Sequence, residues 1–501
     1  MATLNAATLL DVLSDTLVED MGSRIQESGP DSMEDPYFML KTTSMGVTSD
    51  GLGRDFKAIH VMEEGVAGTA KWVALSGGVF DLVGAGLPDL GGHVGLIQDA
   101  NVVSYPGADE AGVVPGYFRK TITLAKGMGN TMAPEEFATA SALDPDNVLA
   151  DMIDRIVTRS ARNAMNAELG CFYAISAKQE LANCGTVGTL SNNLGTNDVA
   201  TVIVRGGSAR QFEKGMWVDL YESTGATKQN STYGYMVSDV RWTPDAADAG
   251  YGAISLQSIP ATTIAGGEIP AVGDILVRRD SIASSVGLGF IGPGVWLTDT
   301  GTVYGMSLTR YQQLKSIMYS AGGVLSEGVL NKLFGRYFKA YGLGNMPDTV
   351  LTSPGCVTAA VENNQGLQRF DRTNKVYTYK EGYDISAIPF TYRGRTVKIA
   401  ESAFMPSDSL MSSASQTGGR AWCLKMRDGN IRRYIPKKPS QYAGNEKFGR
   451  EIFFRNDPPF KVYHSTTGKT TNLDEAPWFR YVAVCPVVLP GINMSSLTES
   501  L

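Results

Sequence analysis

The chain has 501 residues, of which 43% are hydrophobic and 19% are charged, and its formal net charge at pH 7 is −7. At roughly 100 to 200 residues per domain, this length predicts two to four domains. Basic residues form only moderate clusters, such as Arg432, Arg433, Lys437 and Lys438. Because a sequence-specific DNA-binding protein needs a larger basic face, the composition argues against that function. The net charge does not argue against a protein that encloses nucleic acid without binding it tightly.

The cysteines and the N-terminal residues indicate the cellular compartment in which the protein is made. Five cysteines are widely spread, and none forms a pair at the two-residue spacing of a zinc or redox motif. We expect buried free thiols in a reducing compartment. The chain starts without a basic segment before an apolar run, and no stretch approaches the roughly 18 apolar residues of a membrane span. We therefore expect a protein that is made in the cytoplasm.

The first 70 residues are predicted to form an N-terminal arm. From Ala7 to Met21 the apolar side chains recur at spacings of three and four, which predicts a short amphipathic helix. Turn residues and little periodicity follow from residue 30 to residue 70. The apolar stripe of the helix therefore needs another surface, from the same chain or from a neighbouring copy.

Residues 71–127 are predicted to form an extended loop hairpin. Glycines are unusually frequent from residue 76 to residue 116, and Tyr117–Leu124 then alternates apolar and polar side chains as a half-buried strand does. A loop of this length is disfavoured inside a compact domain unless it contacts something outside the domain. We interpret it as an arm that reaches onto a neighbour.

Residues 128–200 are predicted to contain a long spine helix and a peripheral domain. Asp144 is a suitable N-cap, and Pro145 stands at the first helical position. Two rows of apolar side chains spaced by four then continue to Leu169 and form one broad stripe. About 25 residues at 1.5 Å per residue predict a rod of roughly 38 Å.

Residues 201–285 are predicted to form an inserted β domain, because short β-type runs alternate there with glycine, proline and asparagine turns. Regular spacing of short strands is typical of a small barrel or sandwich. Helical patterns resume at Leu308–Met318 and at Gly328–Tyr341, which suggests an insertion into a larger α+β domain. The predicted strands are Thr201–Val204, Met216–Tyr221, Tyr235–Val237, Ala253–Leu256 and Asp274–Val277.

Residues 286–501 are predicted to form an axial domain that returns to the peripheral domain. Thr349–Thr352 and Arg395–Ile399 have strand patterns, and Pro354–Asn363 has a helical one. The hydrophobic run Tyr481–Val484 suggests that the C-terminal part of the chain rejoins a sheet. The overall fold class is therefore α+β.

No catalytic, cofactor-binding or metal-binding residue is predicted. The three histidines, His60, His93 and His464, lie in no metal-binding pattern. Gly287–Gly292 fits the dinucleotide-binding pattern on paper, but no strand–helix–strand unit surrounds it, so a turn is the better interpretation. Gly468-Lys469-Thr470 lacks the first glycine of a phosphate-binding loop. Carboxylates are scattered, and no pair for acid–base chemistry can be selected.

The order of the segments, supported by short motifs in two regions, resembles a known family. In the first region, Phe118-Arg119-Lys120 leads through Met132–Glu136 into Asp144-Pro145-Asp146 and the spine helix. The motifs of the second region are Gly273-Asp274, Gly287-Leu288-Gly289, Val303–Arg310, Val350–Pro354 and Phe404-Met405-Pro406. Together they resemble the major capsid proteins of tailed bacteriophages with the Hong Kong 97-type fold. The β insertion departs from the minimal fold, and no lysine or asparagine can be matched to the family's covalent cross-link.

The resemblance implies a structural protein and not an enzyme. A capsid protein of this family would assemble into hexamers and pentamers of an icosahedral or prolate shell around double-stranded DNA. Its partners would be copies of itself, a portal and possibly scaffolding or decoration proteins, and it would be located in the virion. The alternatives are an encapsulin-like shell around a cargo enzyme, a tail or decoration protein of the same virion, and a β-rich hydrolase with no visible motif.

Overall fold

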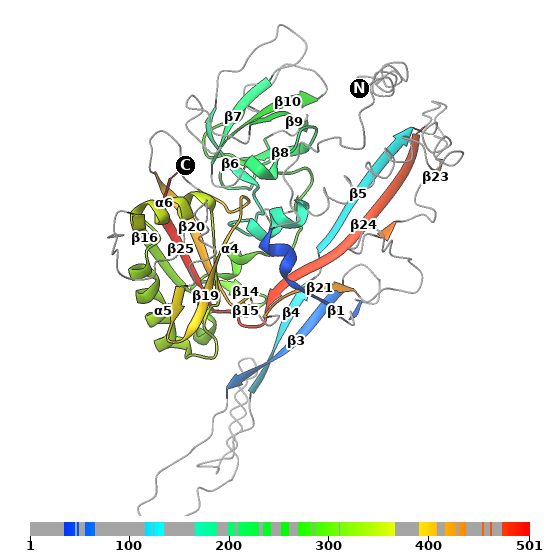
Figure 1. The fold of residues 1–501 in the computed structure, drawn as a ribbon. Helices are drawn as coiled ribbons and strands as arrows, with labels where there is room; N and C mark the ends of the chain where they lie inside the picture. The colour runs from blue at the N-terminus through cyan, green and yellow to red at the C-terminus, as the bar shows by residue number, and fades with distance from the viewer. Residues whose placement is uncertain are drawn as a thin grey trace, which may run out of the picture. The chain divides into compact units, whose positions relative to one another are not determined.

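The structure is a computed structural model, and its described residues fall into two compact units (Figure 1). One unit comprises residues 46–123 and 302–307, and the other comprises residues 1–45, 124–301 and 308–501. The structure describes residues 35–45, 48–49, 56–65, 116–123, 125–134, 166–187, 199–205, 209–229, 234–241, 252–259, 269–283, 286–309, 311–365, 390–407, 416–426, 430–436, 453–454, 461–462 and 473–500.

The smaller unit contains a three-stranded antiparallel sheet in the order β2-β3-β4. β3 (Phe56–Gly65) and β4 (Gly116–Thr123) pair from Lys57 opposite Thr123 to Gly65 opposite Gly116. β2 (Thr48–Ser49) adds a short third strand. The unit also contains a short hairpin, β14 (Thr302–Val303) and β15 (Met306–Ser307).

This sheet changes one predicted boundary. The strand expected at Tyr117–Leu124 is confirmed as β4. β3, however, lies in the range assigned to the arm (residues 1–70) and pairs with a strand in the range assigned to the hairpin (residues 71–127). The sequence signal of β3 is weak because Glu63-Glu64-Gly65 interrupts its alternation, and pairing with β4 supplies what local propensity lacks. The predicted N-terminal helix and most of the glycine-rich segment lie outside the described residues.

A long ladder dominates one sheet of the larger unit. β24 (Leu473–Pro486) pairs with β5 (Ala125–Pro134) from Leu473 opposite Pro134 to Val482 opposite Ala125, and the two strands run side by side in Figure 1. At about 3.4 Å per residue, the 14 residues of β24 span roughly 48 Å. The sheet is completed by β1 (Lys41–Met45), β21 (Ile431–Pro436), β22 (Phe453–Phe454) and β23 (Lys461–Val462). The expected return of Tyr481–Val484 to a sheet is confirmed, and Val482–Cys485 is fully buried.

The predicted β unit is a closed six-stranded barrel in the order β10-β7-β6-β11-β8-β9. Its core consists of alternate inward side chains such as Val202, Val204, Leu220, Val237 and Leu276, each 0% exposed. The strands are β6 (Ala182–Val187), β7 (Val199–Arg205), β8 (Trp217–Tyr221), β9 (Gly234–Arg241), β10 (Ala253–Ile259) and β11 (Ile275–Arg278).

The barrel starts earlier than the predicted boundary at residue 201. The five expected strands are confirmed, whereas β6 lies in the range assigned to the spine helix and peripheral domain. The sequence Ala-Asn-Cys-Gly-Thr-Val of β6 contains small residues and a glycine that carry little strand propensity. Pairing with β7 and β11 on both sides makes it a strand.

The third sheet has the order β16-β25-β20-β17-β19-β18 and packs against two helices. The strands expected at Thr349–Thr352 and Arg395–Ile399 are confirmed, as are the helices expected at Gly328–Tyr341 and Pro354–Asn363. The elements are β16 (Ile317–Gly323), α5 (Glu327–Tyr341), β17 (Thr349–Thr352), α6 (Pro354–Gln365), β18 (Phe390–Tyr392), β19 (Arg395–Glu401), β20 (Gln416–Leu424) and β25 (Ile492–Glu499).

Local chemistry defines α5. Ser326 caps its first turn by accepting a hydrogen bond from the N–H of Val329 at 3.3 Å, and Gly342 ends it with a φ of 72°. Three side chains of this helix, Leu333, Phe334 and Tyr337, are fully buried. The Tyr337 hydroxyl donates to the carbonyl of Pro490 at 2.9 Å, so the helix is held to the segment that enters β25.

Two predicted helices differ from the structure. The helix expected at Leu308–Met318 is wrong, because only Gln312–Leu314 forms a 3-10 turn and the chain then enters β16. The run Ile-Met-Tyr-Ser-Ala-Gly-Gly carries no charge, and its parallel pairing with β25 outweighs the apolar spacing that suggested a helix. Of the predicted spine helix, residues 166–173 are described and are helical, so the helix extends four residues beyond Leu169, where the predicted apolar stripe ends. The rest of the predicted helix lies outside the described residues.

Candidate functional site

A buried polar cluster joins the first described residues to the helix at residues 166–173. Asp35 accepts hydrogen bonds from the N–H of Tyr37 (2.9 Å) and the hydroxyl of Tyr173 (2.7 Å). The hydroxyl of Tyr37 donates to Glu168 at 2.7 Å. Arg433 of β21 lies 3.8 Å from Glu168, between Nε and Oε2, and the two side chains are 4% and 5% exposed. The cluster thus fixes the N-terminal segment, the helix and the ladder sheet to one another.

Arg433 also corrects the sequence interpretation of the basic cluster. The sequence groups it with Arg432, Lys437 and Lys438, but its side chain points into the protein and is nearly inaccessible. Because a buried charge needs a partner, Arg433 is compensated inside the protein by Glu168 and does not contribute to a basic surface. The two lysines lie outside the described residues.

Replacing Asp35 with alanine should destabilise the subunit by about 3 kcal/mol, because the buried hydroxyls of Tyr173 and Ser402 would lose their acceptor. Burial raises the pKa of Asp35. Folding stability from this carboxyl is therefore fully present below its ordinary pKa and decreases as the pH rises through the raised pKa. In urea unfolding, the difference in the free energy of unfolding between the wild type and Asp35→Ala should become smaller as the pH rises from the ordinary pKa of Asp35 through its raised pKa. Asp299→Ala, at an exposed position, is the control, and an equal loss in both variants would contradict the prediction.

The glycine run Gly287–Gly292 packs against the end of the same helix. The side-chain amide of Gln179 donates to the carbonyl of Phe290 (2.9 Å) and accepts from the N–H of Gly289 (2.7 Å). A Cβ at Gly289 would lie 2.4 Å from Cys171 Sγ, and one at Gly292 would lie 2.0 Å from the carbonyl oxygen of Phe172. Close packing therefore requires these glycines, and the predicted turn is confirmed. A one-turn helix, α4 (Pro293–Trp296), follows without having been expected.

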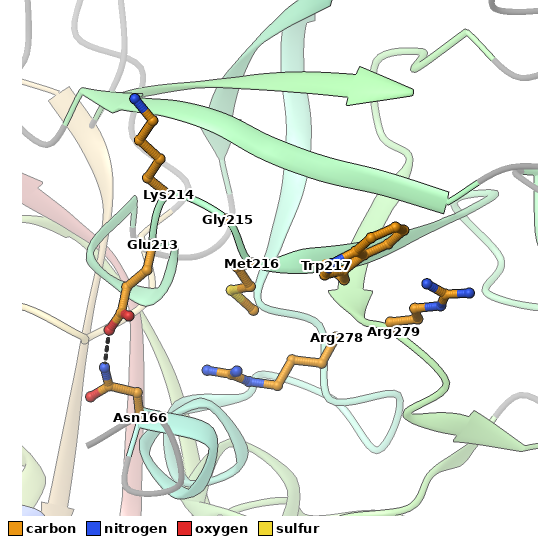
Figure 2. A pocket seen from close by; sticks show the side chains of 8 residues that line it. All are labelled: Asn166, Glu213, Lys214, Gly215, Met216, Trp217, Arg278 and Arg279. Carbon is orange, nitrogen blue, oxygen red and sulfur yellow. Dashed lines mark hydrogen bonds between the residues drawn. The ribbon is translucent and has the colours of Figure 1, made fainter. Parts of the chain in front are cut away.

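A cavity of about 490 Å³ lies between the helix at residues 166–173 and the barrel (Figure 2). Figure 2 shows Arg278 extending from the end of β11 toward Glu213 and Asn166, whose side chains are hydrogen-bonded to each other. Arg279 stacks on Trp217, with its guanidinium carbon 4.6 Å from the ring centroid. The lining residues are Asn166, Glu213, Lys214, Gly215, Met216, Trp217, Arg278 and Arg279. No local sequence signal marks this site, because barrel closure brings its parts together.

Among the described residues, the structure shows neither a metal-binding cluster nor a membrane-spanning helix. In the ranges it describes, no three or more His, Cys, Asp or Glu side chains are grouped so that they could hold a metal ion. His60 lies in β3, whereas His93, His464 and Gly468-Lys469-Thr470 lie outside those ranges. None of the described helices combines the length and apolar character that crossing a bilayer requires.

The cysteines are free, and Cys184, Cys356, Cys423 and Cys485 are buried as predicted, while Cys171 is partly buried. Burial, with the charge of Glu499 as a second cause, raises the pKa of Cys356 to about 12. We expect iodoacetamide at pH 8 to alkylate Cys356 roughly a thousandfold more slowly in the native chain than in urea, because the raised pKa lowers the thiolate fraction by about that factor. Mass spectrometry of the alkylated peptide would measure this ratio. Rapid native labelling would contradict the burial.

No protein-family model and no curated protein matches this sequence. Among solved structures, the chain is similar to one in the cyanophage A-1(L) capsid asymmetric unit, at 10% identity and a TM-score of 0.35, over 80% of this chain and 84% of that chain. It is similar to the capsid chain of Myoviridae phage XM1 at 7% identity and a TM-score of 0.36, over 96% and 98%. The SrpI encapsulin of Synechococcus elongatus PCC 7942 matches at 11% identity and a TM-score of 0.23, over 36% of this chain and 52% of that chain.

Proposed function

We propose that this chain is the major capsid protein of a tailed phage, a subunit that assembles with its own copies into a closed shell around double-stranded DNA. The observation that carries the proposal is the β2-β3-β4 sheet, which belongs to the smaller of the two compact units. Among the described residues, no strand other than β2 pairs with the two long strands of this sheet.

The physical argument is that such a sheet cannot be stable alone. A two-stranded ribbon is marginally stable in water, and a two-residue third strand adds little. β3 and β4 pair over most of their 10 and 8 residues. Because a ribbon of this kind is only marginally stable in water, it needs a surface to pack against. A neighbouring copy supplies that surface in a shell, where repeated contacts between different faces of identical subunits close into rings.

The larger unit suits the body of such a subunit. In this proposal the helix that ends at Tyr173, together with the β5–β24 ladder, forms the peripheral domain. The β16–β18 sheet with α5 and α6 forms the axial domain around the centres of hexamers and pentamers. The barrel has its own core and is an insertion that is presented to other virion components, such as decoration proteins.

The same proposal covers location and chemistry. The chain is made in the host cytoplasm, resides in the virion and contacts a portal and, where present, a scaffold. It performs no catalysis and requires no cofactor, since its function consists of recognising copies of itself. Obligate interfaces of this kind bury on the order of 2,000 to 5,000 Å².

Overexpression of the full chain, followed by analytical ultracentrifugation and electron microscopy, tests the proposal. We expect closed particles or capsomer rings. A compact monomer of 53.7 kDa at all concentrations would overturn the shell function and revive the hydrolase alternative. Particles purified from their natural source distinguish a virus from a cargo compartment, because only a virus protects double-stranded DNA from nuclease.

A further inference from the structure

Exposed basic side chains gather on one side of α5. Lys332, Arg336 and Lys339 are spaced by four and three residues, so they lie along the same side of the helix. All three are exposed. The only carboxylate of the helix is Glu327, in its first turn. The exposed side of α5 therefore carries three positive charges in a row.

The turn between β18 and β19 adds two cations beside this helix. Arg393 extends over the ring of Phe338, with its guanidinium carbon 4.1 Å from the ring centroid. Arg395 is paired with Tyr392, whose ring packs against Phe334 of α5 at 5.9 Å between centroids. Both arginines are exposed. Five exposed cations thus lie on or beside one side of α5, and we refer to them as the basic face: Lys332, Arg336, Lys339, Arg393 and Arg395.

No described carboxylate compensates the basic face. Among the residues that the structure describes, none of its five cations forms a salt bridge. Lys332 instead lies over the ring of Tyr319, with its Nζ 6.0 Å from the ring centroid. The dipole of α5 favours Lys339 in the last turn, but it does not account for two arginines on a neighbouring hairpin. In a chain with a net charge of −7, the basic face is a local surface of the opposite sign.

Arg393 occupies a backbone position that does not favour arginine. Its φ is 48°, and the φ of Gly394 is 77°. A two-residue hairpin turn with both φ values positive normally carries asparagine, aspartate or glycine at its first position. The side chain is held over the rings of Phe338 and Tyr392, at 4.1 and 5.7 Å. Stacking covers the faces of a guanidinium and leaves its N–H edges free to donate to phosphate oxygens.

The row of cations on α5 suits a linear polyanion. Lys332 and Lys339 are seven residues apart, about 10 Å along the helix axis. Double-stranded DNA carries one negative charge per roughly 1.7 Å of its axis, so a duplex that lies along this row presents several phosphates to it. Contacts to phosphates carry no sequence information.

We propose that the basic face binds the phosphate backbone of double-stranded DNA without sequence preference. The choice of DNA among polyanions rests on the proposed function, in which the chain encloses double-stranded DNA. Binding of this kind is weak, with dissociation constants of about 10⁻⁴ to 10⁻⁶ M at physiological salt, because only a few phosphates are neutralised.

Fluorescence anisotropy with a labelled duplex of about 30 base pairs tests this contact on soluble full-length subunits. The logarithm of the affinity should fall linearly with the logarithm of the salt concentration, with a slope of about −3 to −4, since each neutralised phosphate contributes about −0.9. A second duplex of unrelated sequence should bind equally well. A wild-type chain that binds neither duplex at low salt would refute the proposal.

A triple variant separates the basic face from a general charge effect. Lys332→Gln, Arg336→Gln and Lys339→Gln together should bring the slope to about −1 and weaken binding at low salt by about tenfold or more. The matched control removes the same charge from exposed positions elsewhere: Lys214→Gln, Arg241→Gln and Lys398→Gln. The control should keep the wild-type slope, and circular dichroism would confirm that both variants are folded. An equal loss in the two triple variants would mean that the basic face is not the contact.

Single variants of Arg393 test the contribution of the hairpin. Arg393→Gln should reduce the magnitude of the slope by about 1, whereas Arg393→Lys should preserve it because the charge remains. Poly-glutamate serves as a competitor, and its binding more tightly than the duplex would replace DNA by an acidic protein partner.

The DNA contact and the shell can fail separately. Binding is measured on subunits that are not assembled, and the triple variant of α5 should still form particles in the overexpression test. Subunits that bind DNA but never assemble would contradict the shell alone. Particles whose subunits bind no DNA would contradict the basic face alone.

Discussion

Deleting residues 76 to 112 should give a folded, soluble subunit that forms no closed shells. The deleted residues lie between β3 and β4 and belong to the smaller unit, so the barrel and the other sheets of the larger unit keep all their strands. Residues 66–75 and 113–115 remain, and they suffice to connect Gly65 to Gly116, which are paired across the sheet. We therefore expect unchanged circular dichroism and unfolding, but only small oligomers in ultracentrifugation and no particles by electron microscopy.

A linker control distinguishes the sequence of this segment from its length. Replacing residues 76 to 112 with a glycine-serine linker of equal length keeps the reach but removes the side chains that would contact a neighbour. If the contact depends on those side chains, this variant also fails to form shells. Normal particles from the deletion variant would show that the segment takes no part in assembly and would remove the main support for the proposed arm.

Elements with strong local signals could be predicted from the sequence. α5 has a serine cap, a four-residue apolar spacing and a terminal glycine, and its bounds agree with the prediction to within one residue. β17 is a short buried run just before a helix that starts at Pro354. In both cases the signal lies within a few residues of the element itself, where capping and periodicity act.

Elements that depend on partners far away in the sequence could not be predicted from the sequence. β6 and β16 are strands because β7, β11 and β25 pair with them, and neither has strong strand propensity along its whole length. The cavity is a further case, because Asn166 and Arg278 are far apart in sequence and meet only when the barrel closes. The polar cluster likewise combines Asp35 with Glu168 and Arg433, three ionisable residues that look like ordinary surface charges in the sequence.

The glycine run shows how a motif can be explained by packing and not by a ligand. Gly287, Gly289 and Gly292 approximate the spacing of a dinucleotide-binding loop, yet each faces protein atoms of residues 171–179 at distances that leave no space for a side chain. Gln179 fills the position where a ligand would otherwise bond to the loop, since its amide satisfies Gly289 and Phe290. The run therefore fixes the end of the helix to the elements that follow the barrel.

Replacing Gly292 with alanine should destabilise the subunit by about 3 kcal/mol. The added Cβ would lie 2.0 Å from the carbonyl oxygen of Phe172 and 2.7 Å from that of Cys171. Both are backbone atoms, so no side-chain rotation can relieve the overlap, and Phe172 itself is 0% exposed. The φ of Gly292 is −95°, which alanine adopts freely, so the loss would report packing and not backbone strain.

Gly344→Ala is the matched control, because a Cβ at that position meets nothing within 4 Å. Urea unfolding followed by circular dichroism should separate the two variants by most of the predicted difference. If Gly292→Ala were as stable as Gly344→Ala, the helix end and the glycine run would have to be farther apart than the structure places them. The rigid junction between the helix and the rest of the larger unit, on which the proposed role of that helix as a spine depends, would then be lost.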